Sequence, residues 1–123
     1  MSVQQLMHTG PEVPLVEQGT RMSEALLAIA GRRYGCAGIL SERGELVGVI
    51  TDGDLRRHMC PTLLDLYVDD VMTRNPITVG PDLLASAALE LMNSRRITSL
   101  FVVSGAVPVG ILHVHDLLRA GVL

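Results

Sequence analysis

Apolar residues in the first half of the chain recur at helical spacing and then in short runs. The helical spacing predicts a helix over Arg21–Arg33, with Thr20 as its N-cap and Gly35 as its stop. The runs Ala37–Leu40 and Leu46–Ile50 predict two strands joined by a polar hairpin loop. Shorter signals add the remaining elements of this half: a helical turn at Ser2–Met7, an extended piece at Leu15–Val16 and a helix at Asp52–Met59.

The second half repeats the same order of helical and strand patterns. Its predicted elements are a helical turn at Asp69–Met72, a strand at Ile77–Val79, a helix at Leu83–Arg95, strands at Leu100–Val103 and Val109–Leu112, and a last helix from Val114 to Gly121. Each half is thus predicted as β-α-β-β-α. Small sheets covered by helices on one side make the predicted fold class α+β.

The two halves also repeat in sequence. Gly48–Arg57 aligns with Gly110–Arg119, and the arginines that end the first helix, Arg32–Arg33, recur as Arg95–Arg96, where cations suit the helix dipole. A repeated unit this small cannot bury its apolar face alone, so the pair is the folding unit. The expected division is repeat 1 at residues 1–60, a linker at 61–68 and repeat 2 at 69–123, with a ligand cleft between the repeats.

Composition narrows the function classes for this chain of 123 residues. Hydrophobic residues make up 48 %, enough for a packed core, but no apolar stretch reaches the length of a membrane span. The net charge of −3 and the near absence of aromatic residues argue against nucleic-acid binding. The start of the chain lacks a signal-peptide pattern, and Cys36 and Cys60 show no disulfide or metal spacing. We expect a cytoplasmic protein with no membrane or nucleic-acid partner.

The first candidate binding motif is the junction of a strand with a helix at Thr51–Arg57. Backbone N–H groups at a helix N-terminus lack intrahelical partners and the helix dipole is positive there, so Thr51 and Asp54 are placed to bind a phosphate-bearing ligand. Arg57 follows and can meet the same phosphate. The alternative is local, because Thr51 as N-cap and Asp54 three residues later satisfy the same N–H groups without a ligand.

The second repeat carries His113, His115, Asp116 and Arg119 at the matching junction. Histidine is a poor N-cap, so capping alone explains this motif less well than the first. His113 can donate to a phosphate or a sugar-acid carboxylate, or alternatively to Asp116 in a purely structural bond. The two histidines with Asp116 and His8 also suggest a metal site, but the spacing fixes no third ligand, and we expect no metal.

These features together resemble the CBS domain, which is found as tandem pairs. The resemblance rests on the Gly-h-h-Thr-x-x-Asp ending, with h apolar, and on the opening Val71–Pro76 of the second copy. The second copy departs from this ending, because His113 replaces the expected Thr or Ser. The resemblance implies a tandem CBS pair in which the threonine contacts phosphate or ribose and the aspartate accepts from ribose hydroxyls. It further implies that Ile77 and Thr78 line the base pocket and that Thr98 and Ser99 face the cleft.

Three longer segments resemble the regulatory region of bacterial arabinose-5-phosphate isomerases. They are Leu6–Gly10, Thr51–Arg57 and His113–Gly121. In that family a sugar-isomerase domain precedes the CBS pair and makes arabinose 5-phosphate for Kdo, the acidic sugar of lipopolysaccharide and some capsules. The resemblance implies a regulatory fragment without its N-terminal sugar-isomerase domain, with no catalytic residues and no isomerase activity of its own.

The same resemblance implies the regulatory ligand. Feedback by the end product points to a cytidine nucleotide sugar, CMP-Kdo, bound in the cleft, with no other cofactor. Two alternatives stay open: a sensor of AMP or ATP, and a ligand-free oligomerisation module. CBS pairs commonly form two-fold dimers through their helical faces, so we expect a homodimer.

Overall fold

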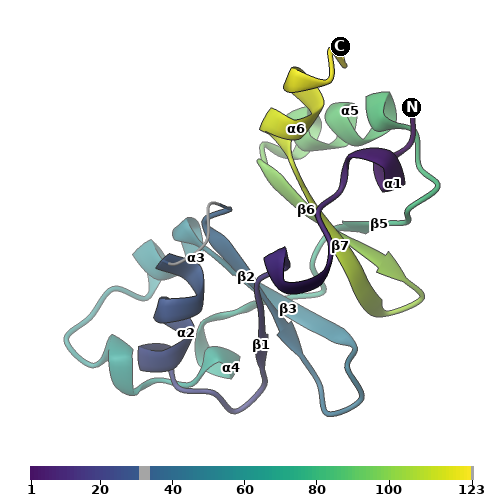
Figure 1. Ribbon diagram of the computed structural model, residues 1–123. Helices are drawn as coiled ribbons and strands as arrows, with labels where there is room; N and C mark the ends of the chain where they lie inside the picture. Colours follow the sequence, from purple (N-terminus) through teal and green to yellow (C-terminus); the bar gives the residue numbers. More distant parts are fainter. Residues whose placement is uncertain (31–33, 123) are drawn as a thin grey trace. The chain divides into compact units, whose positions relative to one another are not determined.

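The structure, a computed structural model, describes residues 1–30 and 34–122, and its chain divides into two compact units (Figure 1). The first unit is Pro14–Pro76, and the second unit combines Met1–Val13 with Ile77–Leu123. Each unit holds one small sheet, its helices and its own apolar core. The predicted α+β class and the β-α-β-β-α order of both repeats are confirmed.

The elements follow one another in the order that Figure 1 labels. They are α1 (Val3–Leu6), η1 (Gly10–Glu12), β1 (Leu15–Glu17), α2 (Met22–Ala30), β2 (Cys36–Leu40), β3 (Leu46–Thr51), α3 (Asp52–Arg57), η2 (Leu63–Asp65), α4 (Val68–Val71), β4 (Thr73–Arg74), β5 (Thr78–Val79), α5 (Ala85–Arg95), β6 (Ser99–Ser104), β7 (Val107–His113) and α6 (Val114–Arg119). None of the helices among the described residues has the length and apolar content that crossing a membrane requires.

Three helix boundaries differ from the predicted ones by two residues. α3 ends at Arg57, before the predicted Met59: His58 leaves the helical conformation, with a φ of −106° and a ψ of 11°, and its ring binds the Asp54 carbonyl at 2.9 Å. The extended residue Leu84 is the N-cap of α5, so this helix begins later than predicted. α6 ends at Arg119 instead of Gly121, whose φ of +78° is incompatible with a helix. The predicted end of the helix at Arg32–Arg33 lies outside the described residues.

The first unit contains a four-stranded sheet in the order β1-β2-β3-β4. β1 runs parallel to β2, whereas the β2–β3 and β3–β4 pairs are antiparallel. The sequence does not predict β4, because two residues carry no measurable periodicity. This strand pairs Thr73 with Val49 and so lays the segment after α4 along β3.

The second unit contains a three-stranded sheet in the order β5-β6-β7. β5 runs parallel to β6, and β6 and β7 form an antiparallel hairpin. His8 lies along β7 as Thr73 lies along β3: it forms a bridge with Ile111, and their backbones exchange two hydrogen bonds of 2.9 Å. The two sheets are therefore built on the same plan.

Each unit is completed by a segment from outside its main run of strands and helices. Val3 in α1 is fully buried in the core of the second unit. Leu63, Val68 and Val71, from the predicted linker and the opening of the second copy, are buried in the core of the first unit. α1 and α4 are thus equivalent short helices, and the compact units divide the chain at other points than the sequence repeat does.

In each unit the side chain of a methionine lies directly against a glycine of the sheet. A Cβ atom added to Gly48 would lie 2.6 Å from Sδ of Met72 and 3.0 Å from the next carbonyl oxygen. A Cβ atom added to Gly110 would lie 2.6 Å from Sδ of Met7 and 3.0 Å from the carbonyl oxygen of His8. Neither approach leaves room for a side chain, so glycine is required at both positions.

Candidate functional site

Asp54 is buried and bound on both carboxylate oxygens at the junction of β3 with α3. Oδ1 accepts from the Thr73 hydroxyl at 2.6 Å and from the Arg57 guanidinium. Oδ2 accepts from the backbone N–H and the hydroxyl of Thr51 at 2.9 and 3.1 Å. The Thr51 oxygen in turn accepts from the Asp54 N–H at 3.4 Å, which completes a capping box. The local capping alternative is therefore realised at this junction.

Asp116 takes the equivalent place at the junction of β7 with α6, but its donors differ. Oδ1 accepts from Nε2 of His8 at 2.9 Å and from the Arg119 guanidinium at 3.0 Å. Oδ2 accepts from the backbone N–H of His113 at 2.9 Å. An imidazole ring from the N-terminal segment thus supplies the donor that the Thr73 hydroxyl supplies in the first unit.

These contacts set the ionisation of Asp116. Burial raises the pKa of the Asp116 carboxyl, but hydrogen bonds from His8, His113 and Arg119, with the charge of a protonated His8, more than offset it. The pKa of Asp116 is consequently below the ordinary value of 3.8. At neutral pH this side chain is a carboxylate that accepts hydrogen bonds.

His113 is the N-cap of α6, which corrects the expectation that capping explains this junction poorly. Its Nδ1 accepts from the backbone N–H of His115 at 3.1 Å, and the two rings lie 4.5 Å apart. An accepting Nδ1 carries no proton, so the N–H of the ring is at Nε2. The side chain that donates to Asp116 is His8, and His113 contributes its backbone N–H to the same carboxylate.

Ser99 carries an orphaned polar atom beside this second junction. Its Oγ is buried and makes no hydrogen bond to any atom of residues 1–30 and 34–122. Ser99 pairs with His113 across the β6–β7 hairpin, and the carbonyl of the preceding Thr98 accepts from the Val114 N–H at 2.9 Å. Leaving a buried hydroxyl unpaired costs about 1–3 kcal/mol, so a polar ligand group beside Ser99 would be stabilised.

The other predicted residues of the second unit lie farther from the junction. Thr78 is in β5 and pairs with Phe101 of β6, and the exposed Ile77 precedes it. β6 lies between β5 and β7, so Thr78 is one strand removed from His113. The structure therefore groups Thr98, with Ser99, closer to the histidine than Ile77 and Thr78.

Arg57 and Arg119 occupy equivalent positions on the two short helices. Their side chains are 63 % and 67 % exposed, and each donates through Nη2 to the aspartate of its own junction. A guanidinium group carries five N–H donors, so one bond to a carboxylate leaves donors that can bind an anion.

A metal site receives no support from the geometry. In the part of the chain that the structure describes, no three His, Cys, Asp or Glu side chains gather as metal ligands. His8 and Asp116, two of the side chains considered for such a site, bond directly to each other.

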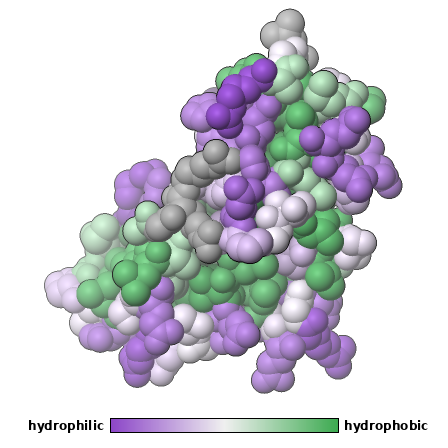
Figure 2. Space-filling model, in the orientation of Figure 1, coloured by the Kyte–Doolittle hydropathy of each residue, from purple (hydrophilic) through white to green (hydrophobic). Residues whose placement is uncertain are grey.

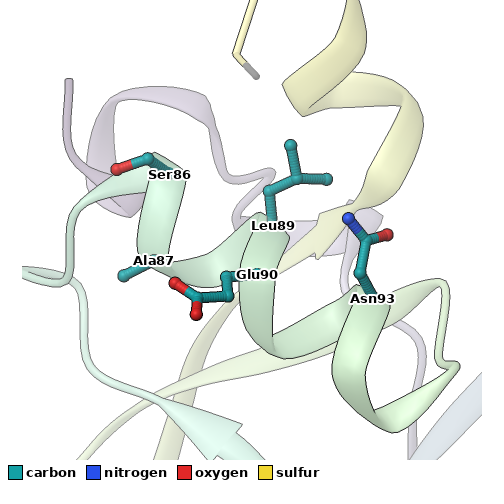
Figure 3. A pocket seen from close by; sticks show the side chains of 5 residues that line it. All are labelled: Ser86, Ala87, Leu89, Glu90 and Asn93. Atoms are coloured by element: carbon teal, nitrogen blue, oxygen red, sulfur yellow. The ribbon is translucent and has the colours of Figure 1, made fainter.

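Two surface hollows lie away from both junctions. One, of about 420 Å³, runs along α5 and is lined by Ser86, Ala87, Leu89, Glu90 and Asn93, all from this one helix (Figure 3). The other, of about 690 Å³, lies beside the β2–β3 hairpin and is mostly polar in its lining residues. A hollow formed by one helix face does not enclose a ligand, so the junctions remain the better candidates.

The roles of Thr73 and His8 as donors to the buried aspartates are missed by the sequence reasoning. Thr73 carries no predicted role, and His8 enters only as a candidate metal ligand. Each directly follows a methionine, Met72 and Met7, after a short helix. This shared position could have predicted that His8 and Thr73 play the same part, because equivalent positions of two repeats have equivalent surroundings.

Comparison with known sequences places these junctions in a family context. The profile of the CBS domain matches residues 3–60 and 68–123. Arabinose 5-phosphate isomerase KdsD of Yersinia pestis is 42 % identical over 125 residues, and that of Escherichia coli (strain K12) is 43 % identical over 125 residues. Each match covers 100 % of this chain but only 38 % of the relative.

Solved structures share the fold at lower sequence identity. CBSX2 in complex with AMP is 23 % identical with a TM-score of 0.84, covering 98 % of this chain and 95 % of that chain. The CBS domain pair of protein MJ0100, in complex with 5′-methylthioadenosine and S-adenosyl-L-methionine, is also 23 % identical, with a TM-score of 0.86 over the same shares. This chain therefore shares its fold with both of these structures.

Proposed function

Because this chain belongs to the CBS domain family, we propose that it is the regulatory pair of a cytoplasmic D-arabinose 5-phosphate isomerase and that it senses CMP-Kdo. Identity to the KdsD isomerases is 42–43 % over the whole chain, against 23 % to CBS pairs that hold adenine ligands. Sensing the activated end product of Kdo synthesis would give the pathway feedback control.

The observation that carries the proposal is the acceptor capacity left at Asp116. A carboxylate accepts about four hydrogen bonds. Asp54 accepts four within its own unit, whereas Asp116 accepts three among the described residues, one of them on Oδ2. We propose that a ligand hydroxyl takes the remaining acceptor position of Asp116 without displacing a donor already present.

The groups around Asp116 match the chemistry of a nucleotide sugar with an acidic sugar. The exposed Arg119 suits a phosphate oxygen or the sugar carboxylate. The unpaired Ser99 hydroxyl adds a buried polar partner on the neighbouring strand. Ribose hydroxyls, phosphate and carboxylate thus each meet a complementary group.

The isomerase reaction belongs to the part of the relatives that this chain does not cover. The chain spans 38 % of the length of the KdsD isomerases. We place the catalytic residues and the substrate site in a preceding sugar-isomerase domain, and we expect the 123-residue chain alone to be inactive. Its role is to change the equilibrium between arrangements of that domain when the ligand binds.

An adenine-nucleotide sensor is the second candidate, since both solved CBS pairs described above hold adenine ligands. The third candidate is a ligand-free oligomerisation module. Leu27 on α2 is 74 % exposed, and Figure 2 shows hydrophobic residues reaching the surface over that helix. Such apolar helix surface suits a homodimer, which we expect with or without ligand.

Calorimetry with AMP, ATP, CMP and CMP-Kdo separates these candidates, with sedimentation velocity run on the same samples. We expect CMP-Kdo to bind most tightly, CMP more weakly and the adenine nucleotides least. Tighter binding of AMP or ATP would replace the proposal with the second candidate. A dimer that binds none of the four would establish the third.

Asp116→Ala and Asp54→Ala form a matched pair for locating the site. Losing an acceptor of ligand hydroxyls costs about 1–3 kcal/mol, so Asp116→Ala should weaken CMP-Kdo binding roughly 5- to 150-fold. Asp54→Ala should bind like the parent. If only Asp54→Ala loses affinity, the ligand binds at the first junction instead. Asp116→Asn, which keeps an acceptor oxygen, controls for loss of the fold.

A further inference from the structure

The ring of His8 lies between the carboxylates of Glu12 and Asp116. Its Nε2 is 2.9 Å from Oδ1 of Asp116 and its Nδ1 is 3.1 Å from Oε2 of Glu12. Carboxylates only accept hydrogen bonds, so each contact requires an N–H on the facing ring nitrogen. Only the protonated ring carries an N–H on both nitrogens, so the double contact is that of an imidazolium.

The fold brings the two carboxylates to His8 by different routes. Glu12 returns to the ring through the η1 turn, where Gly10 has a φ of +64° and Pro11 favours the turn. Asp116 arrives from α6, a separation of 108 residues along the chain. The ring of His8 therefore ties the N-terminal segment to the last helix of the second unit.

We propose that His8 is a proton-operated clasp that holds the segment Met7–Val13 against the last helix of the second unit and opens when the ring loses its second proton. The charged and titratable groups around this clasp are Glu12 from η1, Asp116 and Arg119 from α6, and His113 at the end of β7. Among ordinary side chains histidine changes its charge nearest neutral pH, so pH is the variable that tests the clasp.

The arm to Glu12 is the one that opens. A neutral ring has a single N–H, and the buried Asp116, 7 % exposed, loses more from an absent donor than Glu12, which is 59 % exposed. Arg119 also balances the charge of Asp116, and no ion pair between Arg119 and Glu12 is found among the described residues. With the neutral ring turned to Asp116, the Nδ1 lone pair faces the Glu12 carboxylate and the two repel.

The rest of the segment stays attached when this arm opens. Val3 is fully buried, its N–H donates to the Leu83 carbonyl at 2.8 Å, and His8 keeps its backbone bonds with Ile111. The opening is therefore confined to the η1 turn, whose closing bond runs from the Val13 N–H to the Gly10 carbonyl at 3.1 Å. The clasp shares Asp116 with the proposed ligand site, but its contacts are formed without a ligand.

Amide hydrogen exchange of Val13, measured by NMR on the 123-residue chain between pH 5.5 and 8 and corrected for the intrinsic rate, tests the clasp. Protection of Val13 should fall about two- to fivefold as pH rises, the size expected for a part-exposed ion pair. Protection of Ile111 should change little. Amides of the β6–β7 hairpin report that the second unit of every variant is folded.

His8→Thr is the decisive variant, because it gives the second unit the hydroxyl donor that Thr73 gives the first. It should make Val13 protection independent of pH, and Glu12→Gln should do the same. His58→Gln, which removes a histidine of the first unit, should keep the parent's pH dependence. A flat profile in the parent, or an unchanged pH dependence in His8→Thr, would overturn the proposal.

Discussion

The two strand-to-helix junctions share one backbone plan and differ in the chemistry of their donors. In the first unit a buried aspartate, Asp54, is bound by two hydroxyls, one backbone N–H and an arginine. In the second unit Asp116 is bound by an imidazole, one backbone N–H and an arginine. The same place thus holds an aspartate with four donors in one unit and, in the other, an aspartate with three donors, one of which is an imidazole.

Both junctions cap their helix, but they differ in how many donors bind the aspartate. The Thr51 hydroxyl both donates to and accepts from Asp54, so the first junction satisfies itself. At the second junction His113 accepts through Nδ1 from the His115 N–H, and Asp116 accepts three bonds among the described residues. Repetition of a supersecondary unit fixes the backbone, and substitution of the donors changes how the aspartate of each copy is bound.

The largest expected effect tests what the two units share. Gly48→Ala and Gly110→Ala each force a Cβ atom to within 2.6 Å of a methionine Sδ and 3.0 Å of a backbone oxygen. Each should lower the free energy of unfolding by about 2–3 kcal/mol, the upper part of the range for overpacking. Urea denaturation measures both. Gly80→Ala, with no atom within 4 Å of the added Cβ, is the control and should change stability by about 0.5 kcal/mol or less. A loss in one unit alone would show that the plan is not shared.

The next effect tests the difference in saturation. Asp54→Ala leaves four donor bonds without an acceptor and should cost about 2 kcal/mol, whereas Asp116→Ala leaves three and should cost about 1 kcal/mol. Denaturation of the two variants without ligand gives the order. For ligand binding we expect the reverse order, because Asp116 has the spare acceptor. Equal losses in both measurements would remove the distinction between the junctions.

The smallest effect is the acid response of Asp116. Its pKa in the folded protein lies below the ordinary value, so its stabilising contribution is complete above about pH 4 and is lost as pH falls through the folded pKa. Asp116→Asn lacks this titration. The gap in unfolding free energy between parent and variant should therefore be constant from pH 7 to 5 and shrink below about pH 4. A gap that stays constant to pH 3 would contradict the assignment, and the exposed Asp52→Asn serves as control.

The sequence by itself determined the repeat, the order of elements and the place of the strand-to-helix junctions. Local information suffices for these features, since apolar periodicity and shared motifs such as Gly48–Arg57 and Gly110–Arg119 are read within short windows. The same information is weakest at helix ends, where α3 stops because His58 caps a carbonyl of Asp54.

Only the tertiary structure decided which segments complete each unit and which side chains meet the aspartates. α1 and α4 have similar apolar patterns, so their sequence does not say which sheet each will cover; burial of Val3 and Val68 in different cores does. The bond from His8 to Asp116 spans 108 residues, and no local pattern encodes a contact of that separation. It forms because packing of α1 lays His8 along β7, beside the start of α6.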